Sequence, residues 1–221
     1  MTSEEIHVTL YRDLCDALGA DNVFDRSSEI LPSVEIHPEF IRQAITFLKV
    51  SRAADYLDSI QAADLLGYTG PVSDRSIVPW ASMYPEPHIK IKDEAASEST
   101  EEKIMPRIFL MQYQLFSFDN NEHYILKSML PFENPAVDSI DDMFGNANWL
   151  EREIWDLLGI NFMNSRDLRR LLLPENWKGH PLRRDYVQED TYAGMSTSRP
   201  SPLDEITEAA VENVKKWTDE L

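Results

Sequence analysis

The sequence predicts an α+β domain with an extended C-terminal tail. Three observations favour this fold class: helical and strand-like patterns alternate over residues 5–68, a β-hairpin spans 107–131, and an amphipathic helix follows at 147–160. Hydrophobic residues make up 43% of the 221 positions and charged residues 27%, which suits one globular core with extensions. We therefore predict one domain over residues 1–186 and a tail over 187–221.

The first part of the chain alternates helices and strands. One face of a predicted helix over residues 5–19 carries the apolar residues Ile6, Leu10, Leu14 and Leu18. Gly19 should end this helix. The stretch "SVEIHPEF" combines a short strand with a turn at Pro38, and helical spacing returns from Phe40 to Leu48. The stretch "YLDSIQAADLLGY" then predicts a strand that ends near Gly67.

Residues 69–106 differ from the rest of the domain. They contain five prolines and show no lasting periodicity, and their segment 93–102 carries five acidic residues and no basic one. Such a composition cannot bury enough apolar surface to fold by itself. We predict a loop-rich insertion with an acidic, solvated tip.

The hairpin is the clearest strand signal. Two runs rich in β-branched and aromatic residues, "RIFLMQYQLFSF" and "HYILKSMLP", flank the turn residues "DNNE" at 119–122. A loop should follow, with Asp138 or Ser139 as a candidate helix N-cap.

The helix over 147–160 should bury one apolar face, formed by Leu150, Ile154, Leu157 and Leu158. Arg152 and Asp156 stand four residues apart and are able to pair, and Gly159 is the expected stop. The tail begins as a polar, extended stretch. Its last part, 202–221, has acidic residues first and lysines late, which favours a short terminal helix.

Composition excludes several classes of function. The net charge of −18 argues against nonspecific nucleic-acid binding and against an anionic membrane surface. Cys15 is the single cysteine, so this chain alone can form neither an intrachain disulfide nor a thiolate zinc or iron–sulfur site. We interpret Cys15 as a small buried hydrophobic residue. No signal peptide and no 18-residue apolar run are visible.

Residues 165–186, here called the arginine segment, carry six basic and three acidic residues, a net charge of +3. Arginines beside Trp177, Tyr186 and prolines suit a protein–protein interface, because guanidinium groups pair bidentately with carboxylates. Phosphate binding is a rival interpretation, but it needs a glycine-rich loop and only Gly179 is nearby. A solvated basic face with internal salt bridges is the third interpretation.

No catalytic, cofactor or metal residue is predicted. His180 with Asp185 is the natural general-base candidate, but five residues across Pro181 fix no contact between them. Glu151 and Glu153 are two apart on a helix and point to different faces, so they cannot share acid–base work. Metal-binding, nucleotide-binding and nucleophile-elbow motifs are absent from the sequence.

Two linked motifs, "NWLEREIWDLLGINF" and "DLRRLLLPENWKGHPLRRDY", resemble the signature of the 30 kDa subunit family of respiratory complex I. This family comprises the C-type component of bacterial NADH–quinone oxidoreductase (NDH-1) and the J-type component of the cyanobacterial and chloroplast enzymes. The resemblance covers 107–186 well and 1–68 in element order only. The family usually has Gly-His-Pro just before "DLRR", where this sequence has Asn164, Ser165 and Arg166. The insertion 69–106 also departs from the family.

The resemblance implies a mixed β-sheet flanked by helices. It also implies a peripheral, non-redox subunit of the hydrophilic arm of a proton-translocating NADH- or ferredoxin-dependent quinone oxidoreductase. Such a subunit docks on the 49 kDa-like quinone-site subunit and adjacent iron–sulfur subunits, on the cytoplasmic, matrix or stromal face of the membrane. It binds no cofactor itself: quinone, iron–sulfur clusters and NADH or ferredoxin belong to its neighbours, and the isolated chain should catalyse nothing.

Carried onto this sequence, the resemblance predicts two sets of residues. The motif core should comprise Glu151, Arg152, Glu153 and Asp156. The partner interface should comprise Arg169, Arg170, Trp177, His180, Arg183, Arg184, Asp185 and Tyr186. On this interpretation Arg183→Glu reduces assembly more than folding. Two alternatives are the corresponding subunit of a membrane-bound hydrogenase-type complex and a freestanding enzyme using His180 with a carboxylate.

Overall fold

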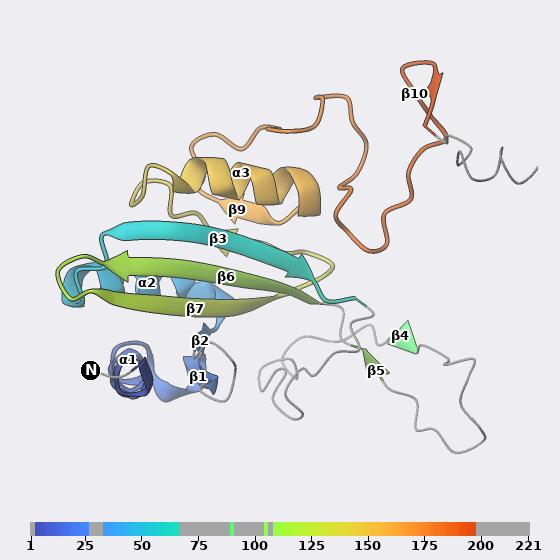
Figure 1. Cartoon of the computed structure of the whole chain (residues 1–221). Helices are drawn as coiled ribbons and strands as arrows, with labels where there is room; N and C mark the ends of the chain where they lie inside the picture. The colour runs from blue at the N-terminus through green and yellow to red at the C-terminus, as the bar shows by residue number, and fades with distance from the viewer. Residues whose placement is uncertain (1–2, 27–32, 67–88, 91–103, 106–107, 198–221) are drawn as a thin grey trace, which may run out of the picture. The chain divides into compact units, whose positions relative to one another are not determined.

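The computed structural model describes residues 3–26, 33–66, 89–90, 104–105 and 108–197 (Figure 1). The chain divides into two compact units, Met1–Tyr186 and Val187–Leu221. The central sheet, the helices and the arginine segment all belong to the first unit. The predicted terminal helix over 202–221 and the acidic tip at 93–102 lie outside the described residues.

The first unit is built on a five-stranded sheet with the strand order β1-β2-β7-β6-β3. Its strands are β1 (Val23–Arg26), β2 (Ser33–Ile36), β3 (Tyr56–Asp64), β6 (Ile108–Ser117) and β7 (Glu122–Pro131). Strands β2 and β7 run parallel, whereas the other neighbours run antiparallel. The sheet is therefore mixed, and the predicted α+β fold class is confirmed.

The predicted hairpin is confirmed as β6 and β7. It pairs Ser117 with Glu122 next to the turn and Ile108 with Pro131 at the far end. Asn121 in the turn has φ 54°, a left-handed conformation that asparagine tolerates. Side chains alternate along both strands as the pleat requires, with one set buried and the other mostly half-buried or exposed.

Three helices pack their apolar faces into one core with the buried face of the sheet. They are α1 (Ser3–Leu18), α2 (Ile41–Ser51) and α3 (Ala147–Leu158), and the short 3-10 turns η1 (Ala20–Asn22) and η2 (Pro38–Phe40) precede β1 and α2. In Figure 1, α2 lies behind the strands and α3 runs along β3. Gly19, with φ 89°, follows α1, and Gly159, with φ 73°, ends α3 in the left-handed conformation, as predicted.

The short strands were not predicted. Strand β1 was missed, as was the parallel pair β8 (Ala136–Asp138) and β9 (Asn161–Met163), which flanks α3 in the sequence. The prediction of an N-cap at Asp138 or Ser139 is wrong, because α3 begins at Ala147 and Ser139 binds a carboxylate instead. Two further pairs are small: β4 (Ile89–Lys90) with β5 (Ile104–Met105), and β10 (Thr191–Tyr192) with β11 (Met195–Ser196).

Candidate functional site

The arginine segment follows β9 without forming a helix and binds the C-terminal half of α3. Arg170 is the centre of this contact. Its Nη1 donates to the Asp156 carboxylate at 2.7 Å, and its Nη2 donates to the carbonyl oxygens of Trp177 at 2.9 Å and Gly179 at 3.2 Å. One guanidinium thus joins the helix to two later points of the segment.

Asp156 is fully buried and accepts from the backbone as well as from Arg170. The amides of Leu171, Leu172 and Leu173 all donate to its Oδ2, at 3.0, 2.8 and 2.9 Å. Burial alone would raise the pKa of Asp156, but the hydrogen bonds from the Leu173 amide and Arg170 outweigh it and lower that pKa. The carboxylate therefore stays ionised and fixes the path of the segment.

His180 serves the same junction. Its Nδ1 lies 2.9 Å from the carbonyl oxygen of Asp156, and because a carbonyl only accepts, Nδ1 must carry the hydrogen. Burial lowers the pKa of His180 despite this bond, and Arg183 and Arg170 add to the lowering. The histidine thus favours its neutral form, and its hydrogen-bond partner here is a helix carbonyl.

Arg183 caps the end of α3. Its Nε donates to the Leu158 carbonyl at 2.6 Å and its Nη2 to the Gly159 carbonyl at 3.3 Å. The guanidinium carbon also lies 5.4 Å from the ring centroids of Phe109 and Phe132. A Cβ at position 159 would come within 2.5 Å of His180 Cδ2, so this approach requires glycine.

Arg184 extends the junction to the sheet. Its amide donates to Asp64 Oδ2 at 2.8 Å, and its guanidinium donates to the Leu66 carbonyl at 2.9 Å. Asp64 is the last residue of β3, so the segment is tied to the sheet as well as to α3.

The remaining predicted interface residues differ in exposure. The Arg169 side chain is 73% exposed and pairs with Asp167 at 3.1 Å. Asp185 is exposed, whereas Trp177 and Tyr186 are half-buried. Sequence reasoning missed the apolar residues that face solvent on α3 and the arginine segment, Trp149, Leu172 and Leu182, which are 60%, 60% and 59% exposed. No signal in the sequence separates them from the apolar residues that become buried.

Three of the four predicted motif-core residues are buried: Glu151, Arg152 and Asp156. Glu153 is exposed, so the two glutamates do lie on different faces of α3. The expected partner of Arg152 is different, however. Arg152 donates to the carbonyls of Arg169 and Arg170, at 3.1 and 3.2 Å, and not to Asp156.

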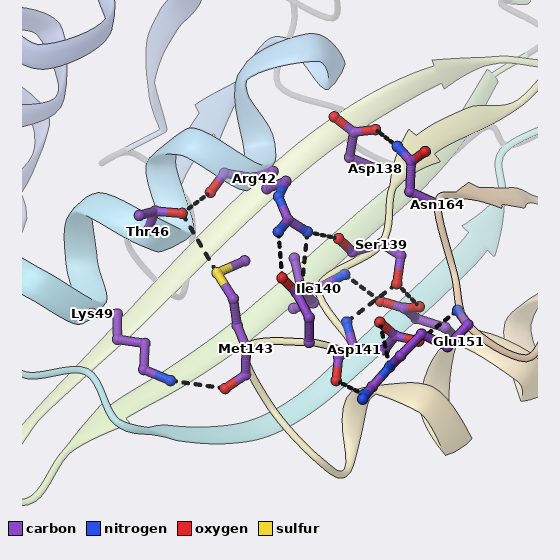
Figure 2. A network of polar contacts seen from close by, with 12 residues as sticks. Arg42, Thr46, Lys49, Asp138, Ser139, Ile140, Asp141, Met143, Glu151 and Asn164 are labelled. Carbon is purple, nitrogen blue, oxygen red and sulfur yellow. Dashed lines mark hydrogen bonds and ion pairs between the residues drawn. The ribbon is translucent and has the colours of Figure 1, made fainter.

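Glu151 organises a second polar network, between α3 and the loop that precedes it (Figure 2). Its carboxylate accepts from the Ser139 hydroxyl at 2.6 Å and from the Ile140 amide at 2.8 Å. Desolvation raises the pKa of Glu151 to about 7, although these two hydrogen bonds oppose the rise. The charges of Asp141 and Asp142 raise it further.

This network also joins α2 to the loop before α3, which the sequence did not predict. Arg42 donates to the Ser139 carbonyl and pairs with Asp142 at 2.6 Å. Asp141 accepts from the Arg166 amide at 2.9 Å, and Asn164 donates to Asp138 at 3.3 Å (Figure 2). Asn164 has φ 62°, a left-handed conformation at the position where the resemblance leads us to expect glycine.

The two networks hold shape, since their charged groups bind one another and the backbone. No group of three or more His, Cys, Asp or Glu side chains that could hold a metal occurs in the part of the chain that the structure describes. Within the same ranges, no helix combines the length and apolar character needed to cross a bilayer.

Fold and site together define a scaffold-type α+β domain whose C-terminal segment is fastened by arginines to the end of one helix. A family model described as "Respiratory-chain NADH dehydrogenase, 30 Kd subunit" matches residues 34–192. The chain belongs to this family, as its motifs predicted, and it is thus one of the complex I subunits of the respiratory chain.

Known relatives match only part of this chain. The C-type component of the NADH-quinone oxidoreductase of Geobacter sulfurreducens is 44% identical over 78 residues, 35% of this chain and 48% of that protein. The C/D-type component of the same enzyme in Buchnera aphidicola subsp. Cinara cedri is 49% identical over 83 residues, 38% of this chain and 14% of that protein. The matched region therefore spans less than half the length of either relative.

A solved structure, "Nqo5 of the trypsin-resistant fragment (1-134) in P63 form", aligns with a TM-score of 0.48 at 22% identity. The alignment covers 72% of this chain and 98% of that one.

Proposed function

We propose that this protein is a non-redox structural component of the hydrophilic arm of a proton-translocating NADH- or ferredoxin-dependent quinone oxidoreductase. In this role it docks on the large quinone-site subunit and holds neighbouring redox subunits at fixed spacing. The observation that carries the proposal is the family match over residues 34–192. Quinone, iron–sulfur clusters and the electron donor would belong to the neighbours, and the protein would sit peripherally on the cytoplasmic, matrix or stromal face.

The partner proposal has separate support. The Buchnera relative carries the designations C and D in one protein. A single polypeptide keeps its two modules close, so the D-type component is the natural neighbour of a C-type one. The exposed part of the arginine segment, with Leu172, Leu182 and Arg169, supplies the apolar and guanidinium groups that protein interfaces favour.

The structure changes which substitution tests docking. Arg183 binds the Leu158 and Gly159 carbonyls, so Arg183→Glu would remove two charge-assisted hydrogen bonds and put an anion at the end of α3. We now expect that variant to lose folding stability, and assembly only as a consequence. A docking test needs residues whose side chains point to solvent.

We therefore expect Leu182→Asp to separate assembly from folding. The side chain is 59% exposed, so the free energy of unfolding of the isolated protein should change by less than about 0.5 kcal/mol. The fraction of protein that co-purifies with the membrane complex should fall by about tenfold, the effect of losing one good interface contact. Circular dichroism melting and native pull-down measure the two quantities.

Val50→Asp is the matched control, because Val50 is 80% exposed on α2, away from the arginine segment. It should leave both quantities unchanged. Unchanged assembly of Leu182→Asp would argue against docking through this surface. Quinone reduction by the isolated protein would contradict the non-redox role altogether.

A further inference from the structure

Four rings gather where the β6–β7 turn meets the start of β3. Tyr56, Phe116 and His123 occupy directly paired positions on the three adjacent strands, so they form one row on one face of the sheet. Phe118 packs edge-on against Tyr56 at 5.7 Å and Phe116 at 4.8 Å between ring centroids, and His123 lies 4.5 Å from Phe116. We call these four residues the ring cluster.

The ring cluster lies on the face of the sheet opposite the core. Its strand neighbours Leu57, Leu115 and Tyr124 are buried in the core, whereas Phe118 is 70% and Tyr56 47% exposed. Farther along the same face the paired positions turn polar, with Gln112 opposite Gln61 and Lys127. The exposed aromatic surface is therefore confined to this end of the sheet, and interfaces are enriched in such rings.

The surroundings of the ring cluster are acidic. Asp55, Asp58 and Asp119 are exposed, lie within two positions of the rings in sequence, and form no ion pair within the described ranges. Arg52 is the arginine next to this end of the sheet, and its carbonyl accepts from Asn120 at 2.8 Å. Its guanidinium is already bound to Asp13, so it does not neutralise the rim.

We propose that the ring cluster binds an arginine-bearing segment of a second partner protein. A guanidinium stacks on exposed aromatic rings and pairs bidentately with carboxylates, and both kinds of group are present here. A second copy of this chain fits poorly, because each copy carries a net charge of −18 and would bring further acidic residues to an acidic rim.

This surface is distinct from the arginine segment. The ring cluster stands at the Tyr56 end of β3, and Arg184 binds Asp64 at the opposite end. The length of β3, at about 3.3 Å per residue, separates the two ends by roughly 25 Å. In Figure 1 the β6–β7 turn and the start of β3 share one end of the sheet, away from the end where β3 finishes. Two neighbours could thus be held at opposite ends of one rigid sheet.

The test rests on the proposed function, because the partner is sought inside the assembled complex. The full-length protein carries Phe118→p-benzoylphenylalanine, is incorporated into the complex in native membranes and is irradiated, and the cross-linked peptide is sequenced by mass spectrometry. The expected product is one cross-link to a segment of another protein of the complex that contains arginine. The same probe in place of Val50 on α2 should give no defined product.

A second pair of variants tests the charge. Asp55→Lys with Asp119→Lys should lower the Phe118 cross-link yield by about tenfold, and the matching Asn changes should lower it less. Circular dichroism of each variant shows whether its fold is intact. Both positions are exposed, so native spectra and melting temperatures are expected. An unchanged yield in the folded Lys variant would overturn the proposed role of the carboxylates.

A probe in place of Leu182 distinguishes the two proposals. Cross-linking from Leu182 but not from Phe118 would overturn the ring-cluster proposal and leave the proposed function standing. Cross-linking from Phe118 to a second copy of the chain, or to a segment without arginine, would also overturn it. Failure of the protein to enter the complex at all would overturn the proposed function.

Discussion

Arg170 and Arg183 show how far residue types alone identify a site. The sequence correctly indicated that residues 165–186 form a distinctive arginine-rich segment, but it could not assign the partners of each guanidinium. Arg170 binds Asp156, fourteen positions earlier, and Arg183 binds carbonyls exposed only because α3 ends at Leu158. Those partners depend on where the helix stops and how the chain returns, which are tertiary properties. The role of these residues at a partner interface stays a prediction.

Glu151 gives a pH-dependent prediction at this scale. Its pKa is raised by burial to about 7 in the folded protein, above the ordinary value of 4.5, so protonation favours the folded state. The stabilisation is fully present below pH 4.5 and is lost as pH rises through 7. The free energy of unfolding of wild type should therefore fall by about 2 kcal/mol relative to Glu151→Gln between about pH 5 and pH 8.

Urea unfolding of both proteins at several pH values measures this difference. Neighbouring groups largely cancel in the comparison. The pKa of Asp141 is lowered, since hydrogen bonds from Arg166 outweigh the effect of burial, and its contribution is lost only at more acidic pH. The control Glu153→Gln, on the exposed face of α3, should track wild type at every pH. Parallel pH curves for wild type and Glu151→Gln would contradict the raised pKa.

At the scale of elements, long periodic patterns were predictable and short strands were not. The helices α1, α2 and α3 and the β6–β7 hairpin each satisfy their own hydrophobic period over ten or more residues. Strands β8 and β9 have three residues each and pair in parallel across the whole of α3. No period can emerge over three residues, and their pairing depends on the helix packing between them.

The junction between α3 and the arginine segment yields the second prediction. Asp156→Asn should weaken the bonds to the amides of Leu171, Leu172 and Leu173 and leave Arg170 without its carboxylate. We expect a loss of about 3 kcal/mol in the free energy of unfolding, as for a broken buried pair. Hydrogen exchange should show at least about tenfold faster exchange at the amides of residues 171–173.

The exchange pattern decides where the effect lies. Amides of the β6–β7 hairpin should keep their protection under native conditions, because the hairpin does not contact Asp156 by any described hydrogen bond. Glu153→Gln again serves as the matched change on the same helix. Unaltered protection at residues 171–173 in Asp156→Asn would show that the carboxylate does not hold the segment.

At the scale of the whole molecule, the core extends beyond the region that defines the family. The family model begins at residue 34, yet α1 and β1 precede it and contribute Leu10, Leu14 and Val23 to the core. The sequence predicted α1 from its apolar face, but not that β1 would add an edge strand beside β2. Nothing local marks that pairing, because β1 has four residues and acquires its partner only when the sheet forms.

If α1 is part of one cooperative unit, a cavity in it should destabilise the distant hairpin. Leu14 is fully buried, so Leu14→Ala should lower the free energy of unfolding by about 2–4 kcal/mol, through lost burial and an incompletely filled cavity. Val8→Ala on the same helix is the control, because Val8 is 62% exposed and its change should stay within about 0.5 kcal/mol. Hydrogen exchange at the slowest amides of β6, which report global unfolding, should accelerate in proportion to the loss in Leu14→Ala and not in Val8→Ala. Acceleration confined to α1 would mean that the helix unfolds independently and that the family region 34–192 carries the stability alone.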